Sequence, residues 1–153
     1  MSTHIRELDF THATNELQDV LFDVSFVNIA TVSKESLFSE QNLNGIKIPG
    51  YKALINTRDR EVLCVVSDNY RLFTNKDALE LGRRAFTELF PIVKPEELVV
   101  YKVIAPKRKT FCHIDLIHKK INFNAWEQET WFPFLRITNS YNRMFALSYE
   151  IGF

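Results

Sequence analysis

One segment of this chain has a clear helical pattern, and it limits the folds that the rest can adopt. Between Thr74 and Phe90 the apolar residues recur with a period of about 3.6 residues and form one wide face. Thr74 and Asn75 can cap the first turn, Asp77 lies near the positive helix end, and Pro91 stops the helix. The other apolar runs are shorter, which is typical of strands. We therefore predict one principal helix, about Thr74–Phe90, packed on a sheet.

The apolar runs outside this helix are spaced like the strands of hairpins. Turns of hairpin length separate neighbouring runs, and strands joined in this way pair antiparallel. The predicted fold class is α+β: a curved, mainly antiparallel β-sheet of hairpins packed on one principal helix, with a short N-terminal helix. The expected strands are 24–32, 52–56, 62–66, 98–105, 110–118, 132–138 and 144–151, and the expected short helix is 14–22.

The burial of particular residues follows from these faces. The run Val62–Val66 is apolar throughout and rich in β-branched residues, which is typical of a central strand covered on both faces. Cys64 and Cys112 both fall in expected strands, where a reduced cysteine behaves as a small apolar residue. The residues that we expect to be buried are Val65, Leu79, Phe86, Leu135 and Phe145.

Length and charge restrict the class of protein. The chain has 153 residues, which suits a single domain (1–153), and we expect 1–13 to be a loosely ordered lead. Lys plus Arg and Asp plus Glu both number 19, so the chain lacks the basic excess common in proteins that bind duplex DNA. No apolar run approaches the ~20 residues of a membrane span, and no signal-peptide pattern begins the chain. We expect a cytoplasmic protein of a bacterial host cell.

One expected hairpin carries the main group of cations. Its tip is Lys107-Arg108-Lys109, and Tyr101, Phe111 and Phe123 interleave with the cations as rings on which bases could stack. Such a surface could follow the phosphates of a single strand, whereas the simpler interpretation is a charged hairpin tip that protects a sheet edge. The candidate nucleic-acid-binding residues are Lys102, Lys107, Arg108, Lys109, Lys119 and Lys120.

A second candidate surface is an aromatic and acidic loop at 125–131. Its carboxylates would repel phosphates, whereas exposed tryptophans beside polar residues are typical of protein interfaces. The candidate partner-binding residues are Trp126, Glu127, Glu129 and Trp131.

Patterns for catalysis and metal binding are weak. His113 and Asp115 would share a strand face while His118 points the other way, and we interpret them as the polar outer face of an edge hairpin. The segment 67–70 has no glycine-rich phosphate loop and no nucleophile elbow, so turn and cap roles explain it. We therefore expect no catalytic residues, no metal and no cofactor.

Two phrases of the chain resemble a phage- and plasmid-borne family known as domain of unknown function 932. The first comprises Pro49, Lys52, Val65-Val66-Ser67, Tyr70, and Asn75 with Asp77-Ala78. The second is the strand that ends in Asn139-Ser140, with the turn and strand after it. The resemblance covers about Ile48–Phe153 and implies the front part of that domain, on a phage or plasmid.

Two functions from different classes follow. The first is a non-enzymatic accessory protein that binds or anneals single-stranded nucleic acid through the basic hairpin. The second is a small protein-binding module, for example an inhibitor of a host defence or replication complex, that acts through the tryptophan-rich acidic loop. Self-association is compatible with both, and nothing positive supports an enzyme.

Overall fold

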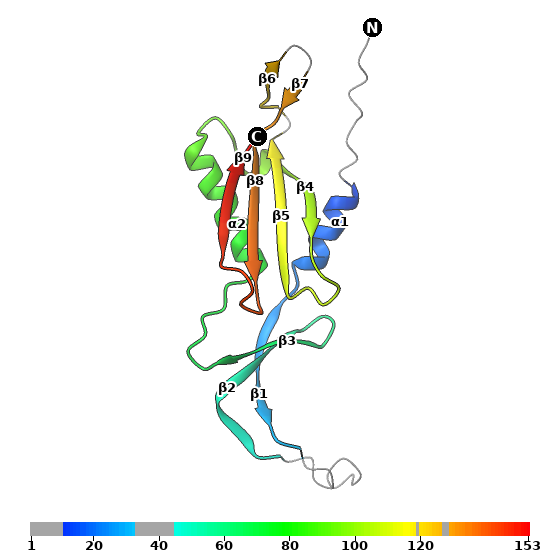
Figure 1. The fold of residues 1–153 in the computed structure, drawn as a ribbon, viewed down its shortest axis with the longest axis vertical. Coiled ribbons are helices and arrows are strands. Elements are labelled where there is room, and N and C mark those ends of the chain that lie inside the picture. Colours follow the sequence, from blue (N-terminus) through cyan, green and yellow to red (C-terminus); the bar gives the residue numbers. More distant parts are fainter. Residues whose placement is uncertain (1–10, 33–44, 119, 127–128) are drawn as a thin grey trace.

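The computed structural model describes residues 11–32, 45–118, 120–126 and 129–153 and shows an elongated molecule with a small sheet at one end (Figure 1). All strand pairs among these residues are antiparallel, and helices pack on the sheet, so the predicted α+β class is confirmed. The elements are α1 (Thr11–Val20), β1 (Val24–Ala30), β2 (Lys47–Asn56), β3 (Glu61–Ser67), α2 (Asn75–Leu89), the 3₁₀ turn η2 (Pro95–Glu97), β4 (Leu98–Ile104), β5 (Phe111–His118), β6 (Phe123–Trp126), β7 (Glu129–Trp131), β8 (Phe134–Ser140) and β9 (Ser148–Gly152).

Helix α2 forms where its sequence pattern predicts. The Thr74 hydroxyl accepts a hydrogen bond from the Asp77 backbone N–H, and the Asp77 carboxylate accepts one from the Thr74 backbone N–H, which completes a capping box. Gly82 lies where α2 crosses the sheet, and a Cβ there would come within 2.7 Å of Ile137 Cδ1 and 2.8 Å of Tyr149 Cε1. The glycine is therefore needed for close approach of helix and sheet.

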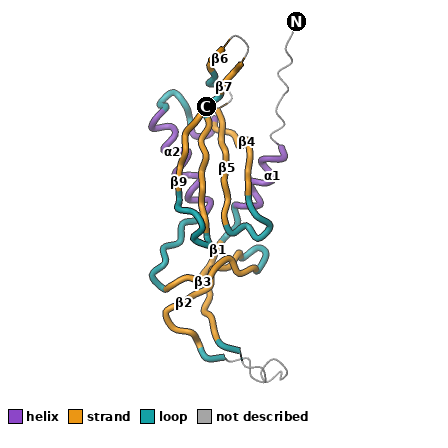
Figure 2. The backbone as a smooth tube through the Cα atoms, in the orientation of Figure 1, coloured by secondary structure: helices purple, strands orange, loops and turns teal. Residues whose placement is uncertain are grey.

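The larger sheet has the strand order β4-β5-β8-β9, and both helices pack on one of its faces (Figure 2). The apolar residues of α1 and α2 share one core with the inward residues of β4, β5 and β8. Among the described residues, no helix covers the other face of this sheet. Strand alternation therefore places one set of side chains in the core and leaves the second set on an uncovered surface. The innermost core residues include Ala78, Phe86, Ile114, Leu116, Leu135 and Ile137.

A smaller sheet, in the order β1-β2-β3, lies beyond one end of the larger one (Figure 1). One of its faces packs around Phe22, Leu54 and Tyr141 in a second core. The strands thus divide between separate sheets, a division that hairpin spacing does not determine.

Two burial predictions are wrong. Val65, which is 50% exposed, lies on β3, an edge strand, so the prediction that Val62–Val66 is covered on both faces is also wrong. Phe145, which is 39% exposed, precedes β9 and contacts the rings of Phe111 and His113 on the uncovered face. Leu79, Phe86 and Leu135 are buried as predicted. Both cysteines are free; Cys112 is buried, whereas Cys64 is half-buried against the second core.

A buried polar network joins β8, the end of α1 and the start of α2, next to the second core. The Asn139 side-chain amide donates to Asn75 Oδ1 at 2.9 Å, and the Asn75 amide donates to the carbonyl of Val20 at 2.8 Å. The Tyr141 hydroxyl accepts from the Asn75 backbone N–H at 2.9 Å. Asn75 and Asn139 belong to the two phrases that resemble domain of unknown function 932, and here both have a structural role.

Other elements differ from their predicted bounds. The short helix spans Thr11–Val20 rather than 14–22, and the expected lead at 1–13 lies outside the described residues except where α1 begins. The expected loop at 125–131 instead contributes to the β6–β7 hairpin. Within the part of the chain that the structure describes, no helix is both long and apolar enough to cross a membrane.

Candidate functional site

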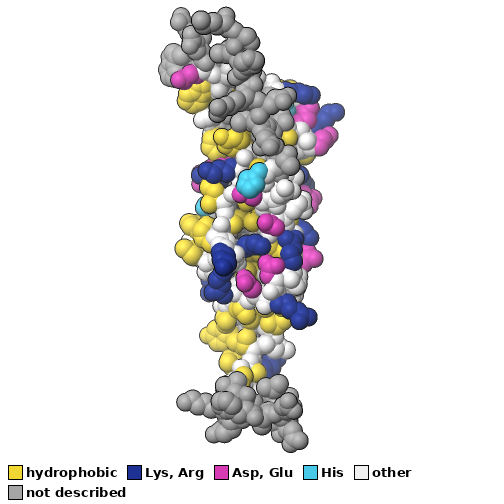
Figure 3. Space-filling model, turned by 90° about the vertical axis from the view of Figure 1, so that its right-hand side faces the viewer, with side chains coloured by type: hydrophobic (Ala, Val, Ile, Leu, Met, Phe, Trp, Pro, Cys, Tyr) yellow, Lys and Arg dark blue, Asp and Glu magenta, His cyan; other side chains and the backbone are white. Residues whose placement is uncertain are grey.

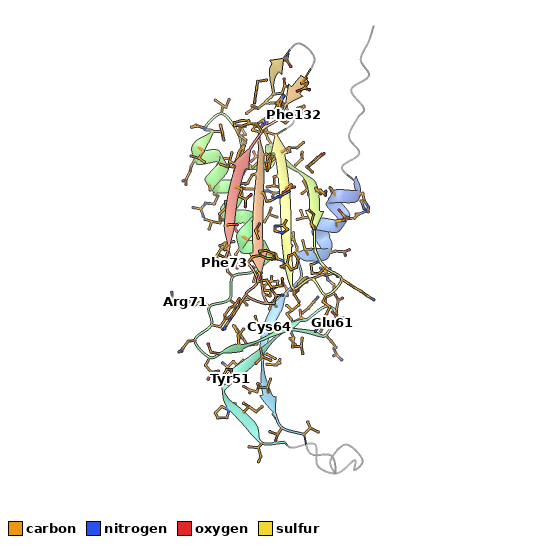
Figure 4. The ribbon with its side chains drawn as sticks, in the orientation of Figure 1. Tyr51, Glu61, Cys64, Arg71, Phe73 and Phe132 are labelled. Atoms are coloured by element: carbon orange, nitrogen blue, oxygen red, sulfur yellow. The ribbon has the colours of Figure 1, made fainter. Side chains whose placement is uncertain are left out.

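The uncovered face of the larger sheet carries a groove of about 620 Å³. Its walls are mainly aromatic and come from β4, β7, β8 and the last residue of the chain. Phe132, labelled in Figure 4, lies between the β6–β7 hairpin and the sheet. The lining residues are Tyr101, Asp115, Ile117, Glu129, Thr130, Trp131, Phe132, Phe134, Arg136 and Phe153.

Strand register brings these side chains together. Asp115 pairs with Arg136, and Ile117 pairs with Phe134, across the β5–β8 ladder. A register shift at Val100/Lys102 re-aims Tyr101 toward the groove. Gly152 makes room for Phe134, because a Cβ on this glycine would lie within 2.4 Å of the Phe134 ring.

A second set of ring contacts supports the groove wall. The Trp131 ring stacks on Phe123, with ring centroids 6.4 Å apart, and Phe123 meets Phe153 edge to face at 5.2 Å. These contacts connect the β6–β7 hairpin to the C-terminal end of β9. Because stacked rings restrict each other's rotation, the wall presents a pre-ordered aromatic surface.

The groove floor is an ion pair held in a fixed geometry. Arg136 donates from Nε to Asp115 Oδ1 at 2.7 Å and from Nη2 to Asp115 Oδ2 at 2.8 Å. The hydrogen bond to Asp115 raises the pKa of Arg136, so this guanidinium stays charged at every physiological pH. The pair is bidentate, which is the strong arrangement, and Asp115 is buried. The cation of the groove is therefore already neutralised by its own carboxylate.

The backbone at the base of the β6–β7 hairpin is held by His118. Its Nδ1 accepts hydrogen bonds from the backbone N–H groups of Lys120 and Ile121, and its Nε2 lies 3.2 Å from Glu97 Oε2. Nε2 therefore carries the proton and donates a hydrogen bond to the Glu97 carboxylate. The hydrogen bond from the Lys94 backbone N–H, followed by that from His118, lowers the pKa of Glu97.

This arrangement predicts that protonation of Glu97 makes the fold less stable at low pH. A carboxylate with a lowered folded-state pKa stabilises the fold above its unfolded value of 4.5, and this contribution is lost as pH falls through the lowered value. Glu97→Gln should therefore lower the free energy of unfolding at neutral pH. On acidification, the free energy of unfolding of this variant should fall less than that of the unaltered chain. Urea denaturation across the acidic range measures this, with Glu96→Gln as the matched control. Equal acid sensitivity of Glu97→Gln and the unaltered chain would exclude the role given to Glu97.

The tip of the predicted basic hairpin is attached to the smaller sheet. Arg108 Nη2 donates to the backbone carbonyl of Val62 at 2.8 Å, and Lys109 Nζ lies 3.2 Å from Asp59 Oδ2. These two cations thus hold the β4–β5 turn against the β2–β3 hairpin, while Lys107 is exposed. Figure 3, which views the molecule from the right-hand side of Figure 1, shows cationic and acidic side chains intermixed over its middle. A surface that binds a chain of phosphates would need an uninterrupted row of cations there.

The remaining candidate cations do not adjoin that tip. Lys102 pairs with Asp115 across the β4–β5 ladder, so a carboxylate of opposite charge lies on the neighbouring strand. Lys120 follows the far end of β5, 3.8 Å from Glu97 Oε1. The 8 residues of β5 span about 27 Å at ~3.4 Å per residue, so Lys120 and the tip lie at opposite ends of the sheet. Lys119 lies outside the described residues.

Two of the four predicted partner-binding residues line the groove. Trp131 contributes a ring and Glu129 an exposed carboxylate at its rim. Trp126 ends β6, and Glu127 lies outside the described residues. The predictions from sequence did not include Phe132, Phe134 and Arg136, although these residues alternate along the expected strand 132–138, a spacing that indicates a shared face; in the structure Phe132 precedes β8.

The candidate metal residues have other partners. His113 Nδ1 lies 2.8 Å from the Thr138 hydroxyl, Asp115 is held by Arg136, and His118 holds the hairpin base. They lie on β5, the inner strand of the β4–β5 hairpin at the edge of the larger sheet, but Asp115 and His118 are buried rather than solvated. Within the described ranges, no three His, Cys, Asp or Glu side chains are grouped as metal ligands.

No protein-family model matches this chain, and comparisons with curated proteins and with solved structures find no similar one. The resemblance to domain of unknown function 932 therefore stays a prediction.

Proposed function

We propose that this chain is a non-enzymatic protein-binding module and that the groove holds a segment of its partner. The observation that carries the proposal is an aromatic groove on the face of the larger sheet that no helix of the described residues covers. Trp, Tyr, Phe and Arg are the side chains enriched at protein interfaces, and all four types line this groove. A phage or plasmid module of this kind would act by occupying a host defence or replication complex.

The surrounding charges support a protein partner over a phosphate chain. Asp115 neutralises Arg136, and Glu129 adds a carboxylate at the rim. A groove with this charge would not attract phosphates. It suits a protein surface, where a central apolar anchor inside a polar rim supplies most of the affinity.

Placing a photo-reactive benzoylphenylalanine at Tyr101 tests where the partner binds. Tyr101 is exposed and lines the groove, whereas Leu81 is exposed on α2 and serves as the matched control. On irradiation of a bacterial host that expresses either variant, we expect a discrete protein adduct from position 101 that survives nuclease and is missing from position 81. Identical adducts from both positions, or none from position 101, would contradict the proposal.

A specific feature favours single-stranded nucleic acid as the second candidate. The uncovered face carries rings at both ends of a four-stranded sheet, because Phe111 and Phe145 lie 4.9 Å apart near the tip, opposite the groove end. Bases stack on the rings of four-stranded sheets in several RNA-binding modules. Under this function, affinity for an oligonucleotide would fall with salt, and Lys107→Ala would reduce the log–log slope by about 0.7. Salt-insensitive or unmeasurable binding to single strands would eliminate it.

A further inference from the structure

Carboxylates outnumber cations among the described residues around the groove. The uncovered face presents a row that alternates in sign across the four strands, because Lys102 pairs with Asp115, Asp115 with Arg136, and Arg136 with Glu150. Glu129 stands at the rim in addition. Among the residues that the structure describes in and beside the groove, three carboxylates therefore face two cations.

The aromatic walls of the groove also favour a positively charged ligand. The face of an aromatic ring is electron-rich and attracts cations, best for tryptophan and less for tyrosine and phenylalanine. Trp131, Tyr101 and Phe153 all line the groove beside Glu129. A guanidinium or ammonium group placed here would meet rings and an acidic rim together, whereas a carboxylate or phosphate would meet electron-rich rings and like charge.

We propose that the segment bound in the groove is cationic, with a Lys or Arg side chain among the rings near Glu129 and an apolar neighbour over Ile117 and Phe134. This inference rests on the proposed function and adds the chemistry of the partner to it. The apolar neighbour follows from the floor beside the ion pair, where Ile117 and Phe134 pair across two strands. The acidic rim then selects among apolar segments by their charge.

Three labelled peptides that differ at two positions test the inference. Their sequences are Gly-Ser-Phe-Xaa-Leu-Xaa-Phe-Ser-Gly, where both variable residues are Arg, Gln or Glu, and fluorescence anisotropy measures binding to the full chain. We expect the Arg peptide to bind about tenfold more tightly than the Gln peptide, since a desolvated cation–ring contact contributes on that scale. The Glu peptide should bind most weakly. Added salt should reduce the differences in affinity among the three peptides, because it screens the charges.

Matched variants place the effect at the groove. Glu129→Gln should reduce the preference for Arg over Gln, and Trp131→Ala should weaken binding of the Arg peptide, whereas Glu88→Gln on α2 should change neither. Equal binding of the Arg and Gln peptides, tighter binding of the Glu peptide, or no binding of any peptide would overturn the cationic partner. The proposed function is judged separately, because an adduct at position 101 without a preference for cations would leave the groove as the binding site.

Discussion

Phe86→Ala is expected to lower the free energy of unfolding by about 3–5 kcal/mol, which is the usual cost of truncating a fully packed phenylalanine. Phe86 is 0% exposed and joins α2 to the core under the larger sheet. Its ring also packs on that of Phe90, with centroids 4.8 Å apart. Truncation removes apolar contacts and leaves a cavity that the rigid sheet on one side cannot fill.

Urea denaturation measures this loss, with Leu81→Ala as the control on the same helix. Leu81 is exposed, so its truncation should change the free energy of unfolding far less than that of Phe86. Both changes replace a residue by the best helix former, so differences in helix propensity cannot explain a large effect of Phe86→Ala. Similar midpoints for the two variants would show that Phe86 does not anchor α2.

The local elements of this fold could be predicted because their signals are local. The period of α2, its capping residues and the hairpin turns all lie within a few residues of the structure that they specify. For the same reason the antiparallel pairing of β2 with β3, and of β4 with β5, follows from turn length.

The burial of β3 could not be predicted, because it depends on what covers the strand. An apolar run is compatible with an inner strand, yet Val65 belongs to an edge strand whose outer face is covered by none of the described elements. Similarly, the cationic turn at 107–109 suggested a surface for phosphates. The partner of Lys109 is Asp59, which lies 50 residues earlier in the chain, and no local pattern connects the two.

The groove could be predicted only in part from the sequence, because most of its residues are brought together by strand pairing. Trp131 and Glu129 were predicted from the local composition, because exposed tryptophans beside polar residues are typical of protein interfaces. Tyr101 and Phe153 join them only through strand register and the β6–β7 hairpin. The ion pair of Asp115 and Arg136 likewise requires the pairing of β5 with β8.

Trp131→Ala is expected to produce the largest loss of partner binding. The ring is half-buried in the groove wall and stacks on Phe123, so it offers a pre-ordered apolar surface at little cost in side-chain entropy. Truncating a tryptophan at the centre of an interface commonly costs more than about 2 kcal/mol, which corresponds to a rise in Kd of about 30-fold. Trp131→Phe keeps a ring at this position and should recover part of the affinity.

The measurement that tests the groove most directly is the Kd of the purified partner, identified from the adduct at position 101, for the unaltered chain and for Trp131→Ala. Thermal unfolding of both proteins serves as the control for folding, and Leu81→Ala serves as the control for a surface change elsewhere. We expect Trp131→Ala to raise the Kd by about 30-fold or more while the chain still unfolds cooperatively and Leu81→Ala leaves the Kd unchanged. A Kd that stays within about twofold of the unaltered value in Trp131→Ala would show that the groove is not the binding site.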